Sequence, residues 1–250
     1  MSAKPVAVEP ITETTGPHRT HIPAEIVARV LARRGTIHPF ADLDPARTAL
    51  VVIDLQNGFM REDLGFAPVA AAPAIVPAVN RLAHALRAAG GKVFWIKNTS
   101  DERSRREWSI METFNLPERV AARNRTMAEG TEGHALWPTL EVLPEDAVLL
   151  KYRYSAFLQG ASALPETLRA EGFDTVLITG TVTSVCCESS ARDAAMLNFR
   201  TVMVSDGNAG FTDAEHNAAL TAFYATFGDV LSVAEIEAIL ADAGATKAAA

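Results

Sequence analysis

The sequence has little of what marks a secreted or membrane protein. It contains two cysteines in 250 residues, Cys186 and Cys187. Because they are adjacent, they cannot cross-link distant parts of a fold, so we expect free thiols and a reducing compartment. No apolar run approaches the roughly 20 residues of a membrane helix. The first 20 residues carry Glu and Pro where a secretory signal needs an apolar stretch. These absences predict a cytoplasmic protein with no membrane partner.

Positive charge and cofactor motifs are scarce as well. Lys and Arg number 23 against 30 Asp and Glu, for a net charge of −7. Nucleic-acid binding draws on clustered Lys and Arg, so we expect no nucleic-acid partner. The sequence has no GxxxxGK[ST] or GxGxxG phosphate loop, no HExxH and no paired-cysteine motif. We therefore expect no cofactor, no metal and a small-molecule partner.

Short apolar runs alternate with helical patterns from residue 48 onward. Strand-like runs occupy 49–55, 92–98, 147–152, 175–181, 201–206 and, more weakly, 229–233. Helical patterns occupy 73–90, 163–172, 184–198 and 212–228. This alternation is typical of a parallel sheet covered on both faces. It predicts an α/β fold, a three-layer α/β/α Rossmann-like sandwich with a mostly parallel sheet of about six strands, in one domain over 46–250.

Two segments depart from this rhythm. Residues 1–45 are interpreted as an N-terminal arm with a short helix. The first 21 or so lack periodicity, which predicts a mobile or partner-bound arm without chemistry. Residues 22–35 form an amphipathic pattern ending at Gly35, a helix that packs on its own domain or on a neighbouring subunit. The weakly periodic stretch 99–146 is either a lid or subunit contact, or a solvated loop.

The chemistry is expected at the carboxyl ends of the strands, where open α/β sheets bind their ligands. Asp54 and Lys151 each follow an apolar run there, and a buried charge is costly without an opposite partner. Taken singly, either residue is no more than the first polar residue after a strand. Together they predict an ion pair at this edge, beside the other polar residues of the strand ends: Gln56, Asn57, Asn98, Tyr152 and residues 183–186.

Cys186 falls at the junction between the fourth strand and the next helix. A helix start offers free amides and partial positive charge, which lower a thiol pKa and stabilise an oxyanion. Thr183 or Ser184 is expected to cap this helix. The alternative is an inert core thiol, the role expected for Cys187. No histidine follows these strands, so Asp54 is the candidate base, and of six histidines only His134 is a candidate substrate contact.

Three motifs resemble those of the isochorismatase-like cysteine hydrolases: VVIDLQNGF at 51–59, KYRYSAF at 151–157 and GTVTSVCCESSARDA at 180–194. The resemblance covers roughly residues 46–240. It implies that Cys186, six residues after Gly180, is the nucleophile, with Asp54 and Lys151 completing a catalytic triad. It also implies a cis peptide between Thr181 and Val182, and an oxyanion hole formed by the amides of Val182 and Cys186.

The resemblance further implies a pocket lined by Asn98, Tyr152, Tyr154 and Phe157, to which we add Asn57 and His134 as candidate substrate contacts. Nicotinamidase-type members bind a metal through an Asp and nearby histidines after the second strand, but residues 98–107 contain no histidine. Nicotinamidase activity is therefore disfavoured. Some members that cleave the vinyl ether of isochorismate lack the cysteine, so its presence here favours amide cleavage.

The expected function is hydrolysis of a small amide, ureido or carbamoyl substrate through a thioester, releasing ammonia or an amine. The closest subclasses are the ureidoacrylate and carbamoyl amidohydrolases, and we expect a homo-oligomer, a dimer or a tetramer. One alternative is vinyl ether hydrolysis with Asp54 as the acid. Another is a catalytically silent oligomeric binding module.

Overall fold

The computed structural model describes residues 8–64 and 66–248 and contains a six-stranded sheet. Every neighbouring pair of its strands is parallel. The order across the sheet is β5-β4-β3-β6-β7-β8. The predicted six-stranded parallel sheet is confirmed. Its strands are β3 (Thr48–Ile53), β4 (Lys92–Asn98), β5 (Ala147–Lys151), β6 (Thr175–Thr181), β7 (Arg200–Ala209) and β8 (Asp229–Leu231).

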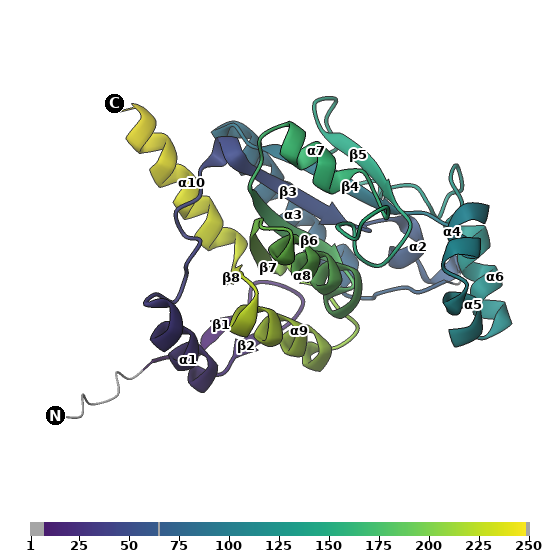
Figure 1. Ribbon diagram of the computed structural model, residues 1–250, viewed down its shortest axis with the longest axis horizontal. Coiled ribbons are helices and arrows are strands. Elements are labelled where there is room, and N and C mark those ends of the chain that lie inside the picture. Colours follow the sequence, from purple (N-terminus) through teal and green to yellow (C-terminus); the bar gives the residue numbers. More distant parts are fainter. Residues whose placement is uncertain (1–7, 65, 249–250) are drawn as a thin grey trace.

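Helices cover both faces of the sheet, which confirms the three-layer architecture (Figure 1). On one face lie α3 (Ala72–Ala89) and α10 (Val233–Ala248), the latter a helix that the sequence reading did not predict. On the other lie α7 (Leu164–Ala170), α8 (Glu188–Met196) and α9 (Asp213–Thr226). No helix within the described residues is long and apolar enough to cross a lipid bilayer.

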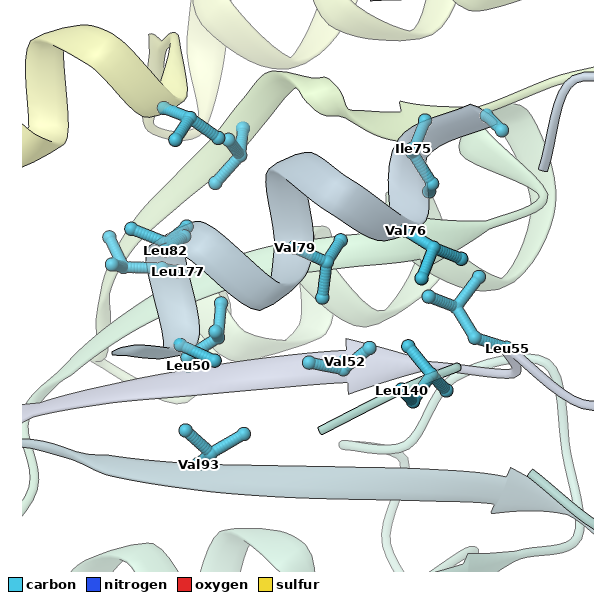
Figure 2. Packing of buried hydrophobic residues seen from close by; sticks show 14 of the residues in the cluster. Leu50, Val52, Leu55, Ile75, Val76, Val79, Leu82, Val93, Leu140 and Leu177 are labelled. Carbon is cyan, nitrogen blue, oxygen red and sulfur yellow. The ribbon is translucent and has the colours of Figure 1, made fainter. Parts of the chain in front are cut away.

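Alternate residues of the central strand β3 face the two helical layers. All six are buried, because a parallel strand between two layers is covered on both sides. Figure 2 shows Val76, Val79 and Leu82 of α3 lying over Leu50 and Val52. The intervening residues of β3 belong to the opposite core with α7, α8 and α9. The double burial explains why this strand reads as an uninterrupted apolar run.

Gly180 permits the close approach of β6 to the end of β3. Its φ is 122°, and a Cβ at this position would lie 2.0 Å from the carbonyl oxygen of Ile53. Only glycine avoids that clash. Directly after β3 the chain turns at Asp54, whose φ is 58°. The ends of β3 and β6 are thereby held together where the candidate catalytic residues begin.

The N-terminal segment packs on the domain, so the predicted mobile or partner-bound arm is wrong for residues 8–21. The strands β1 (Ile11–Glu13) and β2 (Thr20–Ile22) form an antiparallel pair beside α9 (Figure 1). The side chain of His18 is 5% exposed and that of Ile22 is fully buried. Burial by α9, distant in sequence, orders a segment that has no periodicity of its own. Residues 1–7 of the predicted arm lie outside the described residues.

The predicted N-terminal helix is α1 (Ala24–Arg34), and it packs on its own domain. Its Val27 and Val30 enter the core of the α9 face. Near its end, Arg33 donates to the carbonyl of Ala225 and Arg34 to that of Gly228. The helix ends at Gly35, as the sequence predicted, and the structure shows that Gly35 has a left-handed conformation.

Residues 99–146 contain three helices at one end of the molecule: α4 (Glu102–Glu107), α5 (Ile110–Phe114) and α6 (Pro117–Thr126) (Figure 1). The solvated-loop alternative is therefore wrong for these three helical segments, whereas residues 127–146 form turns and loops. Short elements fill the remaining connections: 3-10 turns at Pro45–Arg47 and Glu62–Leu64, and α2 (Asn57–Met60).

Candidate active site

Asp54 and Lys151 form a fully buried ion pair at the carboxyl edge of the sheet. Lys151 ends β5 and Asp54 follows β3, with β4 between them. The Nζ atom of Lys151 lies 2.7 Å from Oδ2 of Asp54, and both side chains are 0% exposed. The same Nζ donates to the carbonyl of Arg153 at 3.1 Å and to Sγ of Cys186 at 3.5 Å. Side chains from three strand ends therefore meet within contact distance.

Burial makes the Asp54 carboxylate a stronger base than an exposed one. Desolvation raises its pKa, against the lowering effects of Lys151 and Cys186. Within the described structure neither carboxylate oxygen has a hydrogen bond of regular geometry, so the contact with Lys151 is an ion pair. For Lys151, burial lowers the pKa, but the interactions with Asp54 and Cys186 outweigh it and raise the pKa. The lysine keeps its proton while the carboxylate is ready to accept one.

Cys186 lies between β6 and α8, at the predicted junction, but in a π-helical turn, η3 (Thr183–Cys187), rather than in an α-helical first turn. Its side chain is 3% exposed. Burial raises its pKa to about 12, and the opposing attraction of Lys151 does not overcome this. The expected lowering of the thiol pKa is therefore wrong, because desolvation dominates at this depth. The adjacent Cys187 is fully buried in the core, its expected position.

A histidine packs behind the turn that carries Cys186, at the place where a helix cap was expected. Neither Thr183 nor Ser184 caps α8, whose N-cap residue is Cys187 with no side-chain hydrogen bond. Thr183 Oγ1 instead lies 3.0 Å from Nδ1 of His216, whose Nε2 lies 3.2 Å from Oγ1 of Thr20. The N-terminal strand pair and α9 thus brace the turn that carries Cys186. No local sequence signal indicates this contact, because its members are up to 196 residues apart.

The peptide bond between Thr181 and Val182 is cis, at the position where the resemblance implied one. Thr181 donates from its hydroxyl to the carbonyl of Ala209 on the neighbouring strand. The cis bond directly precedes η3. Of the two residues expected to form the oxyanion hole, Val182 directly precedes the turn η3 and Cys186 lies within it.

Gln56 connects the ends of two strands and was not assigned a role from the sequence. Its Nε2 donates to the carbonyls of Asn98 and His134, and its Oε1 accepts from the amide of Asn98. The side chain therefore fixes the backbone around Asn98. The position of Gln56 shortly after β3 was the sequence feature from which this role could have been predicted.

A cavity of about 160 Å³ opens above Cys186. Its wall is largely apolar and includes side chains from the 99–146 segment, the contribution expected of a lid. The residues that line it are Phe59, Phe66, Ala67, Asn98, Trp108, Met111, Glu112, Asn115, Arg119, Val120, Arg123, Tyr154, Val182, Val185, Cys186 and Phe211. Such a volume resembles the ~150 Å³ cavity that accommodates benzene, so a small ligand fits.

Two of the six expected substrate contacts, Asn98 and Tyr154, line this cavity. Tyr152 does not, because it faces a separate hollow between β5 and α4. Phe157 is 1% exposed and packs in the core against Phe199, with ring centroids 5.6 Å apart. Of the three aromatic side chains after Lys151, only Tyr154 is therefore directed to the cavity.

Asn57 and His134 also lie away from the cavity. Asn57, the first residue of α2, donates from Nδ2 to the carbonyl of Glu132, and this bond ties the helix to the loop that contains Glu132. His134 is 1% exposed, with Nε2 2.8 Å from Oγ1 of Thr99. Burial and the nearby charge of Lys97 lower its pKa to about 4, so it stays neutral. Both side chains stabilise loops around the site.

No group of three or more His, Cys, Asp or Glu side chains that could hold a metal ion occurs among residues 8–64 and 66–248.

The family model of the isochorismatase domain matches residues 48–235. This range is most of the chain and includes all of the elements that carry the site. The chain belongs to the isochorismatase family. The ureidoacrylate amidohydrolase RutB of Methylobacterium radiotolerans is 32% identical over 213 residues, which cover 79% of this chain and 81% of that protein. This family member therefore shares most of its length with a protein named as an amidohydrolase.

Solved structures of similar fold include a cysteine hydrolase from Pseudomonas syringae pv. phaseolicola. It has a TM-score of 0.73 and 26% identity, and the match covers 81% of this chain and 96% of that one. The N-carbamoylsarcosine amidase of Thermoplasma acidophilum has a TM-score of 0.59 and 25% identity over 75% of this chain and 96% of that one. Proteins similar to this isochorismatase family member thus include ones named as a cysteine hydrolase and as an amidase.

Proposed function

We propose that this isochorismatase family member is a cysteine-dependent amidohydrolase that cleaves small ureido or carbamoyl compounds. The observation that carries the proposal is the position of Lys151 Nζ, 2.7 Å from the Asp54 carboxylate and 3.5 Å from the Cys186 thiol. Cys186 lines a cavity sized for a small molecule, and the Asp54–Lys151 ion pair is fully buried next to the thiol. A base, a cation and a nucleophile in mutual contact are the components of covalent amide cleavage.

In the first step the thiol proton moves to Asp54 as the sulfur attacks the substrate carbonyl carbon. Burial favours this transfer at the acceptor, because it raises the pKa of Asp54. It opposes the transfer at the donor, because the pKa of Cys186 is raised to about 12. The transfer is therefore expected to accompany attack rather than precede it, with Lys151 balancing the charge on sulfur.

The tetrahedral intermediate places negative charge on the former carbonyl oxygen. In this proposal the backbone amides of Val182 and Cys186 donate to that oxygen. Asp54 returns its proton to the departing nitrogen, so ammonia or an amine leaves neutral. The remaining thioester, a thiocarbamate if the substrate is a ureide, is then hydrolysed by a water that Asp54 deprotonates, which regenerates the thiol.

The names of two similar proteins support the substrate class. One is a ureidoacrylate amidohydrolase and the other an N-carbamoylsarcosine amidase. Both names denote substrates with a carbamoyl group, a carbonyl carbon flanked by an amino group and a second nitrogen. That group is small and planar, which suits the limited cavity above Cys186.

An ammonia-release screen over small primary amides, ureido acids and carbamoyl amino acids tests the proposal. We expect turnover with at least one carbamoyl compound, abolished in Cys186→Ala. The matched control is Cys187→Ala, which removes the neighbouring buried thiol and should retain activity. Full turnover by a folded Cys186→Ala variant would rule out covalent catalysis. Release of pyruvate from isochorismate without ammonia from any amide would support vinyl ether hydrolysis instead.

A further inference from the structure

Arg123 is a cation in the cavity without an anionic partner among the described residues. It lies on α6, is half-buried, and lines the same cavity as Cys186. Within the described residues its guanidinium has no hydrogen bond or ion pair, and it lies over the Trp108 ring, with Cζ 5.7 Å from the ring centroid. A partly desolvated charge held on an aromatic face and left unpaired is costly, so such a group is expected to bind an anion.

The charges around Arg123 do not supply that anion. Burial lowers its pKa, as do the positive charges of Arg105 and Arg153. The acidic side chain of Glu112 also lines the cavity, but it is exposed and forms no ion pair with Arg123 in the described structure. Tyr154 and Cys186 are uncharged at neutral pH because burial raises both pKa values. Among the described residues, no anionic side chain therefore pairs with Arg123 in the cavity.

Asn98 provides a second unsatisfied group in the same cavity. Its side chain is 5% exposed, and its Oδ1 is buried with no hydrogen-bond partner in the described structure. The backbone of Asn98 is fixed by Gln56 on both its amide and its carbonyl. A buried acceptor held rigidly in this way is complementary to an N–H group. The cavity thus combines an acceptor for a carbamoyl nitrogen with a cation for an anionic group.

We propose that Arg123 binds a carboxylate of the substrate, so that the site selects ureido or carbamoyl acids over neutral amides of the same shape. The inference rests on the proposed function and specifies its substrate class. A guanidinium pairs with a carboxylate through two parallel hydrogen bonds, which fixes orientation as well as adding affinity. Binding at Arg123 would orient the carbamoyl end of the acid toward Asn98 and Cys186.

The test measures binding without turnover. In a Cys186→Ala background, titration calorimetry compares 3-ureidopropionate with its neutral analogue 3-ureidopropionamide. We expect the acid to bind more tightly, and Arg123→Gln to weaken the acid by roughly 10- to 100-fold while leaving the amide nearly unchanged. Arg123→Lys should restore part of the affinity. The matched control is Arg125→Gln, which removes an exposed charge from the same helix outside the cavity and should change neither ligand.

Equal binding of acid and amide by Cys186→Ala would overturn the proposal, and that comparison requires no change at Arg123. Equal weakening of both ligands by Arg123→Gln, or the same loss of acid binding in Arg125→Gln, would overturn it too. Failure of the proposed function is a separate result: the unaltered protein would release no ammonia from any amide. In that case the binding assay would still report whether the cavity prefers the acid to the amide, because it does not depend on turnover.

Discussion

Replacing Lys151 with methionine removes the cation from a fully buried ion pair while keeping a similar side-chain length. Asp54 would remain 0% exposed, without its 2.7 Å partner. Losing one member of a buried pair costs about 3 to 5 kcal/mol, because the remaining charge is left uncompensated. With a denaturant slope of about 3 kcal/mol/M, the urea midpoint should fall by about 1 M or more.

The deficit of Lys151→Met should depend on pH with a definite sign. Burial already raises the pKa of Asp54, and Lys151 is the main group lowering it. Without the lysine the folded-state pKa rises further above its unfolded value, so the folded protein binds the proton more tightly. Its free energy of unfolding therefore falls as pH rises through this range. Measured against the unaltered protein, the deficit should be larger at pH 8 than at pH 5.

The double variant Lys151→Met, Asp54→Asn is the matched control. Asparagine tolerates the left-handed backbone of Asp54, where φ is 58°, and it removes the uncompensated charge. We expect this variant to recover most of the lost stability and to show no pH-dependent deficit, although it should be inactive. The reasoning is refuted if urea unfolding shows the double variant to be as unstable as Lys151→Met, or the single variant's deficit to be equal at both pH values.

Three further predictions concern the supporting structure. Because burial raises the pKa of Cys186 to about 12, the rate at which iodoacetamide alkylates it should increase continuously from pH 7 to 10. Mass spectrometry measures this labelling, and a rate that reaches a plateau near pH 8.5 would contradict the prediction. Burial lowers the pKa of His216 to about 3 in the folded protein. Below about pH 6.5 this histidine therefore binds a proton in the unfolded chain but not in the folded protein, so the free energy of unfolding falls on acidification. His216→Gln should flatten that acid slope in urea unfolding between pH 7 and 4.5, and an unchanged slope would count against it. Gly180→Ala should lower the free energy of unfolding by more than about 4 kcal/mol, because its Cβ would clash with the Ile53 carbonyl. Gly35→Ala is the control: its Cβ would meet open space, so it should cost only about 1 to 2 kcal/mol for the left-handed backbone. Similar losses in the two variants would argue against the close approach of β6 to β3.

Much of the site could be named from the sequence because parallel strands end at one edge. Asp54, Lys151 and Cys186 each follow an apolar run of a different strand, and the structure brings their side chains into contact. Substrate contacts were harder to predict. Tyr152, Tyr154 and Phe157 are close in the chain, yet they face a separate hollow, the cavity and the core, respectively. After a strand ends, no fixed period determines where a side chain points.

The environment of the thiol also required the structure. From the sequence alone, a cysteine at a helix start is expected to have a lowered pKa. The depth at which Cys186 is buried reverses that expectation, because desolvation raises the pKa of its thiol. Burial is a property of the whole packed molecule, so neither the sign of this shift nor its cause is encoded in the residues beside the cysteine.

The layered α/β architecture, the order of the strands along the chain and the strand ends that carry the candidate catalytic residues could all be predicted from the amino-acid sequence. These depend on local hydrophobic period and on the geometry that any parallel sheet imposes. The tertiary structure decided which distant groups meet: Thr20 and Thr183 through His216, Arg123 over the cavity of Cys186, and the N-terminal strands against α9. Such contacts join residues far apart in the chain, and only the packed core brings them within reach.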